Sequence, residues 1–498
     1  MMTRARAVWL AACVIGLSVT VQWSPGLWAE DAPSADSRPN ILWIIVEDMS
    51  PHFHCYGETV IDTPHVDRLA HQGVRFTRAF TTGPVCSASR SALITGMYQT
   101  SIGAHHHRSS RGTEKIYLPE SVRLVPELLQ QAGYFTCNRQ GILGQPKPGK
   151  TDYNFVWSPQ VYDGVDWSER PNGKPFFAQI QLQGGKLREA TNWRERAEAT
   201  LGSLTDPQSV QLPPYLPDDP RIRQDWADYL DSVRFTDYEL GVILERLERE
   251  KLAANTVVFF FSDHGISHVR AKQFLYDAGI HIPLIVAGPG IAVGQTRDDL
   301  IEHIDIAAAT LALAGVTIPP SMHGRNIFAA DYQPRRYVHA ARDRCDETVD
   351  RIRAVRTDRF KYIRNFEPDR PYLQPNAYKD HKVIVQAMRE LYAAGALNEA
   401  QALIMADQRP PEELYDLQND PHEIHNLAGK REYLTTLIEL RGELAQWIST
   451  TGDQGQKRES VYMYDSDMKV YLESVRRTDP ERARVIEKNI EWMKARWR

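Results

Sequence analysis

Two apolar runs of this 498-residue chain are continuous rather than alternating. Residues 41–46 read ILWIIV and residues 256–261 read TVVFFF, and polar residues follow each run closely. A strand loses the alternation of apolar and polar residues when both of its faces are buried, as in a parallel sheet covered by helices. The two runs therefore predict buried strands of an α/β fold.

Segments with helical spacing separate and follow these strands. They cover residues 66–72, 91–97, 121–132, 225–250 and 304–314. Strands that alternate with helices predict a large, mainly parallel sheet between helices. In such a sheet, binding sites form at the carboxyl ends of the strands.

The pattern changes near residue 334 to short, charged, strand-like pieces, followed by a helical segment. This predicts a smaller α+β domain with a short antiparallel sheet. The predicted organisation is a signal peptide (1–29), a linker (30–38), a main domain (39–333), a smaller C-terminal domain (334–460) and a charged helical tail (461–498).

The first residues are typical of a cleaved secretory signal. Arg4 and Arg6 precede an apolar run that ends near Ala29. We therefore expect an exported protein, periplasmic or secreted. The stretch before Cys13 also resembles a lipoprotein cleavage box, so a lipid anchor is the alternative. No later segment is apolar for long enough to predict an integral membrane span.

Charge and cysteine content exclude two further classes of protein. The formal net charge of -5 argues against a general nucleic-acid binder. Of the five cysteines, Cys13 falls in the predicted signal, and the remaining four are too few for a disulfide framework in a chain of this length.

Acidic residues follow both predicted strands. Glu47 and Asp48 come after the first, and Asp263 and His264 come after the second. Either pair alone could simply cap the next turn. Carboxylates gathered at neighbouring strand ends repel one another, so the two pairs together predict one divalent cation. Calcium is the expected ion, and the imidazole of His264 keeps magnesium and manganese as alternatives.

Residues 84–96, PVCSASRSALITG, place Cys86 ahead of the helix predicted for 91–97. The N-terminus of a helix favours a bound anion. A cysteine here could be a buried thiol, half of a disulfide or a nucleophile. Arg90, four residues later, makes a merely buried thiol less attractive.

The order Cys86-x-Ala88-x-Arg90 resembles the signature C-x-[P/A]-x-R of the type I, formylglycine-dependent sulfatases of the alkaline-phosphatase superfamily. The likeness runs from Pro39 to about Ala428 through phrases such as PNILWIIVED, FSDHG and ELYDLQNDPHE. GKTDYNF and RDR are most similar to N-sulfoglucosamine sulfohydrolase-like members and polysaccharide sulfatases.

The resemblance implies an alkaline-phosphatase-like fold with a large mixed sheet, and 39–333 would be the catalytic domain. A maturase would oxidise Cys86 to formylglycine, and the hydrated aldehyde would release inorganic sulfate from O-sulfates or N-sulfates of a sulfated carbohydrate. Arg90 and Lys150 would contact the hydrate, and Lys272 would bind the sulfate. The residues that would bind the metal, together with residue 86, are Glu47, Asp48, Asp263 and His264.

Several positions depart from the family pattern. Glu47 replaces an aspartate and His264 an asparagine. Asp152 and Lys186 stand where the family has histidines, and we expect Lys186 to serve in catalysis and substrate binding. The general acid stays open, because a lysine protonates a leaving group well only when its pKa is lowered.

Two segments outside the matching phrases have alternative interpretations. His105, the first of three consecutive histidines, is assigned to substrate binding, with a solvated loop as the alternative. The arginines of residues 342–370 form either a charged strand face or a subsite for an anionic sugar.

Two other functions compete with sulfate hydrolysis. One is a phosphodiesterase or phosphonate monoester hydrolase of the same superfamily, which uses the same nucleophile. The other is a glycan-binding homologue without catalysis, suggested by Asp152 and Lys186 at histidine positions.

Overall fold

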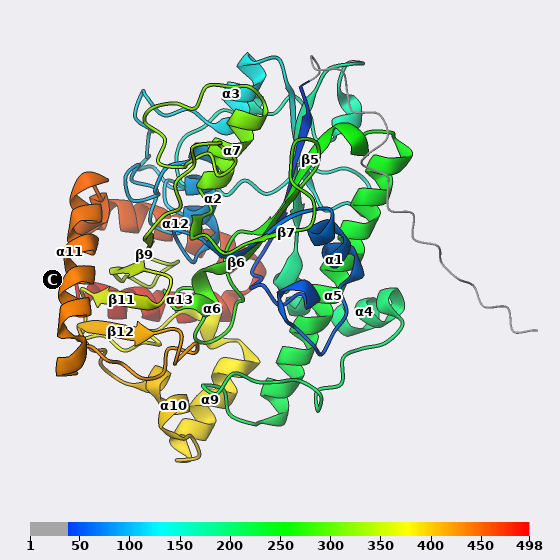
Figure 1. Ribbon diagram of the computed structural model, residues 1–498. Helices are drawn as coiled ribbons and strands as arrows, with labels where there is room; N and C mark the ends of the chain where they lie inside the picture. Colours follow the sequence, from blue (N-terminus) through cyan, green and yellow to red (C-terminus); the bar gives the residue numbers. More distant parts are fainter. Residues whose placement is uncertain (1–37, 498) are drawn as a thin grey trace, which may run out of the picture.

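The computed structural model describes residues 38–497, and an eight-stranded sheet forms its centre (Figure 1). The strands of this sheet are β1 (Asn40–Val46), β2 (Gly73–Phe80), β3 (Phe135–Gln140), β4 (Phe176–Leu182), β5 (Thr256–Ser262), β6 (His281–Ala287), β7 (Gln295–Arg297) and β8 (Ile301–Glu302). Their order is β3-β4-β1-β5-β6-β2-β7, with β8 beside β2. Only β6 runs antiparallel to its neighbours, which confirms the prediction of a mixed, mainly parallel sheet.

Helices cover both faces of the sheet. They are α1 (Pro64–His71), α2 (Cys86–Thr95), α3 (Val125–Gln131), α4 (Trp193–Leu201), α5 (Pro220–Arg249), α6 (Asp277–Ile280) and α7 (Asp305–Leu313). Figure 1 shows α2, α3 and α7 on one side, and α1, α4 and α5 on the other. Successive side chains of β1 therefore enter two different apolar clusters, as Leu42 and Trp43 do. Both faces are buried, which explains why the run at 41–46 does not alternate.

Helix α2 begins earlier than its sequence predicts. The expected helix was 91–97, whereas α2 starts at Cys86 and ends before Gly96, whose φ of 62° stops it. The first turn holds small polar residues, so it lacks the apolar spacing on which the prediction rests. Their hydroxyls bond inside the protein instead: Ser89 Oγ donates to the carbonyl of Asp263 at 2.5 Å.

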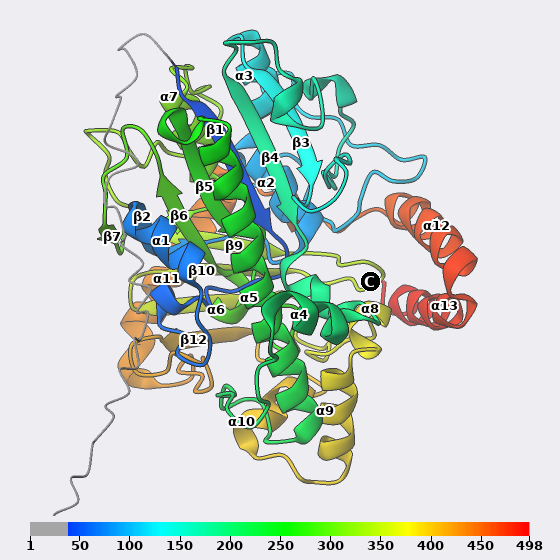
Figure 2. The same ribbon diagram turned by 90° about the vertical axis from the view of Figure 1, so that its right-hand side faces the viewer.

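A second, antiparallel sheet follows in the chain, as predicted. Its strands, in the order β12-β11-β10-β9, are β9 (Val338–Arg342), β10 (Ile352–Arg356), β11 (Phe360–Asn365) and β12 (Glu412–Asp416). The helices around it are α8 (Ala377–Asp380), α9 (Val383–Ala393), α10 (Glu399–Ala402), α11 (Leu434–Thr450), α12 (Val461–Thr478) and α13 (Pro480–Lys494). Figure 2 shows α12 and α13 as a hairpin beside α8. Apolar residues of both sheets belong to one cluster, so the two parts share a core.

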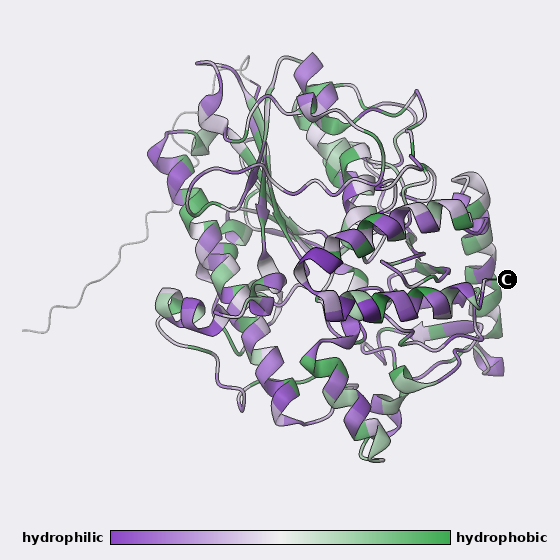
Figure 3. Cartoon of the chain, turned by 180° about the vertical axis from the view of Figure 1, so that it is seen from behind, coloured by the Kyte–Doolittle hydropathy of each residue, from purple (hydrophilic) through white to green (hydrophobic). Residues whose placement is uncertain are grey.

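The surface helices mix hydrophilic and hydrophobic residues, and the central strands lie inside (Figure 3). Among residues 38–497, none of the helices is apolar over a stretch that would cross a bilayer. The signal-peptide prediction for 1–29 lies outside the described residues.

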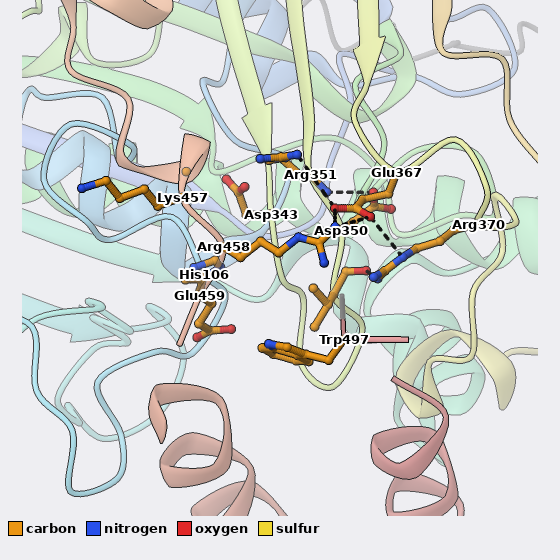
Figure 4. Close-up of a pocket in the computed structure, with 12 residues that line it drawn as sticks. His106, Asp343, Asp350, Arg351, Glu367, Arg370, Lys457, Arg458, Glu459 and Trp497 are labelled. Carbon is orange, nitrogen blue, oxygen red and sulfur yellow. Dashed lines mark hydrogen bonds and ion pairs between the residues drawn. The ribbon is translucent and has the colours of Figure 1, made fainter. Parts of the chain in front are cut away.

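Most arginines of segment 342–370 form ion pairs within the protein. Arg344 and Arg353, for example, are fully buried, and each contacts two carboxylates. In the pocket of Figure 4, Glu367 forms ion pairs with Arg370 at 3.7 Å and with Arg458 at 2.8 Å. The contacts thus favour the charged strand face over the anionic-sugar subsite.

Asp350 is the acceptor at the centre of this ion-pair network. Arg409 donates two hydrogen bonds to its carboxylate, at 2.8 and 2.9 Å, and Arg342 donates another. Burial alone would raise the pKa of Asp350, but Arg409 and Arg342 lower it from 3.8 to about 2.

We expect Asp350→Asn to lower the free energy of unfolding by about 3–5 kcal/mol, because two buried guanidinium groups lose their counter-charge. The folded pKa is the lower one, so the carboxylate stabilises the wild type above pH 4. About 2 kcal/mol of that is lost as the pH falls towards 2. Denaturation at pH 7 and at pH 3, where roughly half of that loss is expected, measures both effects. The exposed Asp331→Asn is the control, and equal stability of the two variants would contradict the prediction.

Candidate active site

The two acidic pairs predicted from the sequence meet at the carboxyl ends of β1 and β5. These strands are parallel neighbours, and Val46 is paired with Ser262, so the residues that follow lie side by side. The backbone N–H of Asp48 donates to Asp263 Oδ1 at 3.1 Å. Sheet topology alone therefore gathers the polar residues 47, 48, 263 and 264.

Asp48 leaves the strand in a left-handed conformation, with φ of 53°. Such a conformation is unfavourable for a residue other than glycine and is kept only where the surroundings fix it. The loop after β4 does so: the N–H of Gly185 donates to the carbonyl of Glu47 at 2.9 Å. A Cβ at Gly185 would lie 2.2 Å from the carbonyl oxygen of Asp48, so only glycine allows this close approach.

Four buried side chains form a group that fits a cation. One ligand atom each from Asp48, Asp263, His264 and Cys86 lies within 4.8 Å of the others. His264 Nδ1 donates to the carbonyl of Gly265 at 2.9 Å, which leaves Nε2 free, 3.2 Å from Asp48 Oδ1. A fixed imidazole and two carboxylates are suitable donors for a divalent ion.

Glu47, the fourth predicted ligand, is not in that group of four. Its Oε1 contacts Lys150 at 2.8 Å and Arg90 at 3.2 Å, and its Oε2 contacts Lys186. Although burial alone would raise the pKa of Glu47, these cations hold it far below its ordinary value.

Cys86 lies between the acidic group and two ammonium groups. Its Sγ is 3.2 Å from His264 Nε2, 3.4 Å from Lys272 Nζ and 3.6 Å from Lys186 Nζ. Burial opposes ionisation, but Lys150, Lys186 and Lys272 hold the pKa of Cys86 at about 7. The ammonium groups near residue 86 therefore outweigh burial and the carboxylate of Asp48, and they stabilise negative charge there.

Arg90 is one helical turn from Cys86 and connects the two acidic pairs. Its guanidinium is buried and donates to Asp263 Oδ2 at 3.2 Å and to Glu47 Oε1 at 3.2 Å. A third hydrogen bond, of 2.5 Å, goes to Gln181 of β4. The sequence prediction missed Gln181. The signal was the pair of glutamines in the otherwise apolar run FFAQIQL.

Lys272 is buried rather than solvated. Its ammonium donates to both oxygens of Asp48, at 3.0 and 2.9 Å. Tyr378 of α8 lies against the same pair, with its ring centroid 4.9 Å from Lys272 Nζ and its hydroxyl 3.4 Å from Asp48 Oδ2. Tyr378 arrives from the second sheet region, so nothing near it in the sequence indicated its place.

The three consecutive histidines are buried, not solvated, and they occupy different places. The ring of His105 packs against that of His106, with centroids 4.2 Å apart, and no described contact joins it to Cys86. His107 instead reaches the start of α2, where its Nδ1 is 2.8 Å from Ser87 Oγ. The structure thus brings His107 to the site, and not the predicted His105.

His107 belongs to a second compact group, with Cys345 and Asp346. Arg108 Nη1 lies 3.4 Å from Asp346 Oδ1, and His107 Nδ1 is taken by Ser87. A guanidinium already provides the positive charge that Asp346 needs, so this group is a poor fit for a metal ion.

Two family models match the chain. The sulfatase model covers residues 39–316, and the model of the C-terminal part of N-sulphoglucosamine sulphohydrolase covers 264–402.

Two curated proteins are similar over most of their length. An ulvan-active sulfatase of Formosa agariphila is 34% identical, over 85% of this chain and 77% of that protein. The human N-sulphoglucosamine sulphohydrolase is 25% identical, over 84% of this chain and 91% of that protein.

Among solved structures, a Bacteroides thetaiotaomicron protein assigned as a sulfatase has a TM-score of 0.62 at 20% identity, covering 86% of this chain and 96% of that one. This supports the alkaline-phosphatase-like fold. A family model covers residues 39–316, more than half of the chain, and a relative is above 30% identity, so the chain belongs to the sulfatase family.

Proposed function

We propose that this sulfatase removes sulfate from a sulfated carbohydrate, as an O-sulfate or an N-sulfate, with residue 86 as its nucleophile. The observation that carries the proposal is the position of Cys86 Sγ, between His264 Nε2 at 3.2 Å and Lys272 Nζ at 3.4 Å. An anionic group at residue 86 would meet positive charge from several directions. The carbohydrate substrate is inferred from the similar proteins, whose names refer to ulvan and to N-sulphoglucosamine.

Two groups complete this site in the proposal. Formylglycine at residue 86 would supply, as its hydrate, one hydroxyl that attacks sulfur and a second whose deprotonation expels sulfate. One divalent cation, with calcium proposed, and magnesium and manganese as alternatives, would acidify a hydroxyl and neutralise sulfate oxygens. Asp48, Asp263, His264 and residue 86 would hold it, with Glu47 beside them.

The remaining residues orient and neutralise. Lys272 lies between Asp48 and residue 86, where its ammonium can bind a sulfate oxygen. Lys150 contacts Glu47, and its ammonium adds positive charge near residue 86. Arg90 fixes the two acidic pairs and the start of α2 relative to each other.

Lys186 contributes charge rather than a proton. Burial lowers the pKa of a lysine, but the carboxylates of Asp48 and Glu47 and the group at residue 86 raise the pKa of Lys186 well above its ordinary value. A strongly held proton is poorly transferred to a leaving group. We therefore assign Lys186 to binding of the sulfate.

Maturation and export complete the proposal. Cys86 is 2% exposed, so a formylglycine-generating maturase would act before folding is complete. We propose export of the chain to the periplasm or the medium. We also propose residues 39–333 as the catalytic domain, 334–460 as the smaller domain and 461–498 as its helical tail.

The test compares p-nitrophenyl sulfate and sulfated oligosaccharides with phosphodiester and phosphonate substrates. We expect release of inorganic sulfate, with kcat/KM for sulfates above that for phosphoesters. Phosphoester turnover that greatly exceeds sulfate release would assign the chain to the competing reaction. Binding of sulfated glycan without any release, by protein with formylglycine at residue 86, would identify a non-catalytic homologue.

A further inference from the structure

The loop after α2 lies directly against the start of that helix. Ser87 follows Cys86 in the chain, and its Oγ accepts the backbone N–H of Arg108 at 2.8 Å. The same hydroxyl donates to His107 Nδ1 at 2.8 Å. Since adjacent Cα atoms are about 3.8 Å apart, this contact puts the backbone of Arg108 within roughly 10 Å of residue 86. The side chain of Arg108 therefore starts at the edge of the active site.

The guanidinium of Arg108 differs from the buried arginines of this protein. Its side chain is 47% exposed, and its described polar contact is a single one, between Nη1 and Asp346 Oδ1 at 3.4 Å. Asp346 itself is 5% exposed and cannot turn to solvent easily. A guanidinium has five N–H donors, so most of them stay available to a ligand from solvent.

The contacts of the loop fix its backbone at Arg108. Both Arg108 and Ser110 have positive φ, of 55° and 64°, although neither is glycine. Asp467 of α12 accepts the backbone N–H of Arg111 at 2.8 Å, and Asn154 donates to the carbonyl of His106 at 2.8 Å. Unfavourable backbone angles persist where the surroundings fix them, so the backbone from which the Arg108 side chain starts is set in advance.

The neighbouring cations on this side of the site already have partners. Arg111 donates to Asp152 at 2.8 Å, and Lys150 contacts Glu47 at 2.8 Å. Asp152 occupies the place where the family pattern has a histidine. Its carboxylate and the carbonyl of Tyr153, at 3.1 Å, hold the guanidinium of Arg111. Of Arg108, Arg111 and Lys150, Arg108 has the most exposed side chain, and its nearest ion-pair contact is the longest, so its N–H donors are the most available to a ligand.

We propose that Arg108 binds a second anionic group of the substrate, a carboxylate or a further sulfate on the same or the adjoining sugar. This rests on the proposed function. A planar guanidinium fits both oxyanions through paired hydrogen bonds. Asp346 binds one edge of the guanidinium, and the substrate would replace water at the N–H groups that face solvent. The enzyme would then prefer glycans with a second anionic group over glycans whose only charge is the sulfate that is removed.

The test measures sulfate release by wild type, Arg108→Gln and Arg108→Lys. The substrates are a uronate-containing sulfated disaccharide, its carboxyl-reduced analogue, and a disaccharide without uronate that carries two sulfates. For wild type we expect kcat/KM to be about 10–100-fold higher on the substrate with a second anion than on the reduced analogue. In Arg108→Gln this ratio should fall to near one. Arg108→Lys keeps the charge but loses the paired geometry, so its ratio should be intermediate.

The control is Arg336→Gln, which removes another exposed, ion-paired arginine and should leave the ratio as in wild type. Thermal unfolding of each variant checks that it is folded. A ratio that stays the same in Arg108→Gln, or a wild type with no preference for the second anion, would overturn the inference. Comparison of the carboxylate and disulfate arms tells which anion is preferred. Absence of sulfate release from all substrates would instead refute the proposed function on which the subsite depends.

Discussion

Cys86→Ala should abolish sulfate release, with a fall in kcat of about 10⁴-fold or more, while the protein stays folded. Residue 86 carries the nucleophile of the proposed reaction. Its Sγ lies within 3.7 Å of the side chains of Asp48, His264, Lys186 and Lys272. The substitution removes one buried atom at the start of α2, so the loss of stability should be only about 1 kcal/mol. Initial rates with p-nitrophenyl sulfate, together with thermal unfolding, separate the two effects.

Cys137→Ala is a matched control, because Cys137 is also a free cysteine and only 1% exposed, but lies in the core at β3. It should keep wild-type activity. Mass spectrometry of the peptide around residue 86 should show that sulfur and two hydrogens have been exchanged for one oxygen in the active wild type. Full activity of Cys86→Ala, or an unmodified thiol in fully active protein, would contradict the proposed nucleophile.

The parts of the fold with strong periodic signals could be predicted from the sequence. The buried runs at β1 and β5 and the long helix α5 follow directly from apolar spacing, because burial on two faces or one face leaves that pattern. The first turn of α2 could not be predicted in this way. Its residues are small and polar, and they are held by hydrogen bonds rather than by an apolar face. Ser89 donates to the carbonyl of Asp263, and Ser91 donates to the carbonyl of Ser87.

The residues of the site also differ in how far the sequence could predict their positions. The acidic pairs were predictable because strand ends carry their residues to a fixed edge of the sheet, whatever the loops do. The positions of Arg108 and Tyr378 were not. Both side chains are placed by tertiary contacts with residues distant in the sequence, Asp346 for Arg108 and Asp48 for Tyr378. Three consecutive histidines likewise gave no indication of which one would face α2.

The second large effect is expected on metal binding, which should change both stability and activity. Asp48 is fully buried, and it is the carboxylate nearest to both residue 86 and Lys272. Without a cation, the carboxylates of Asp48 and Asp263 repel each other, and chelation should destabilise the wild type. With calcium at about 100 times its dissociation constant, the folded state should gain about 2.7 kcal/mol.

Asp48→Asn should lower kcat/KM by about 10³-fold or more, because the site loses a ligand and the partner of Lys272. It should also lose the rise in melting temperature that calcium gives the wild type. Asp166→Asn is the control: Asp166 is 3% exposed and ion-paired with Arg139 and Arg246, so its loss should destabilise the fold yet leave the calcium response intact. Melting curves with calcium and with a chelator distinguish the two variants. If Asp48→Asn still responded to calcium as wild type does, the cation would have to be held without Asp48, and the proposed ligand group would be wrong.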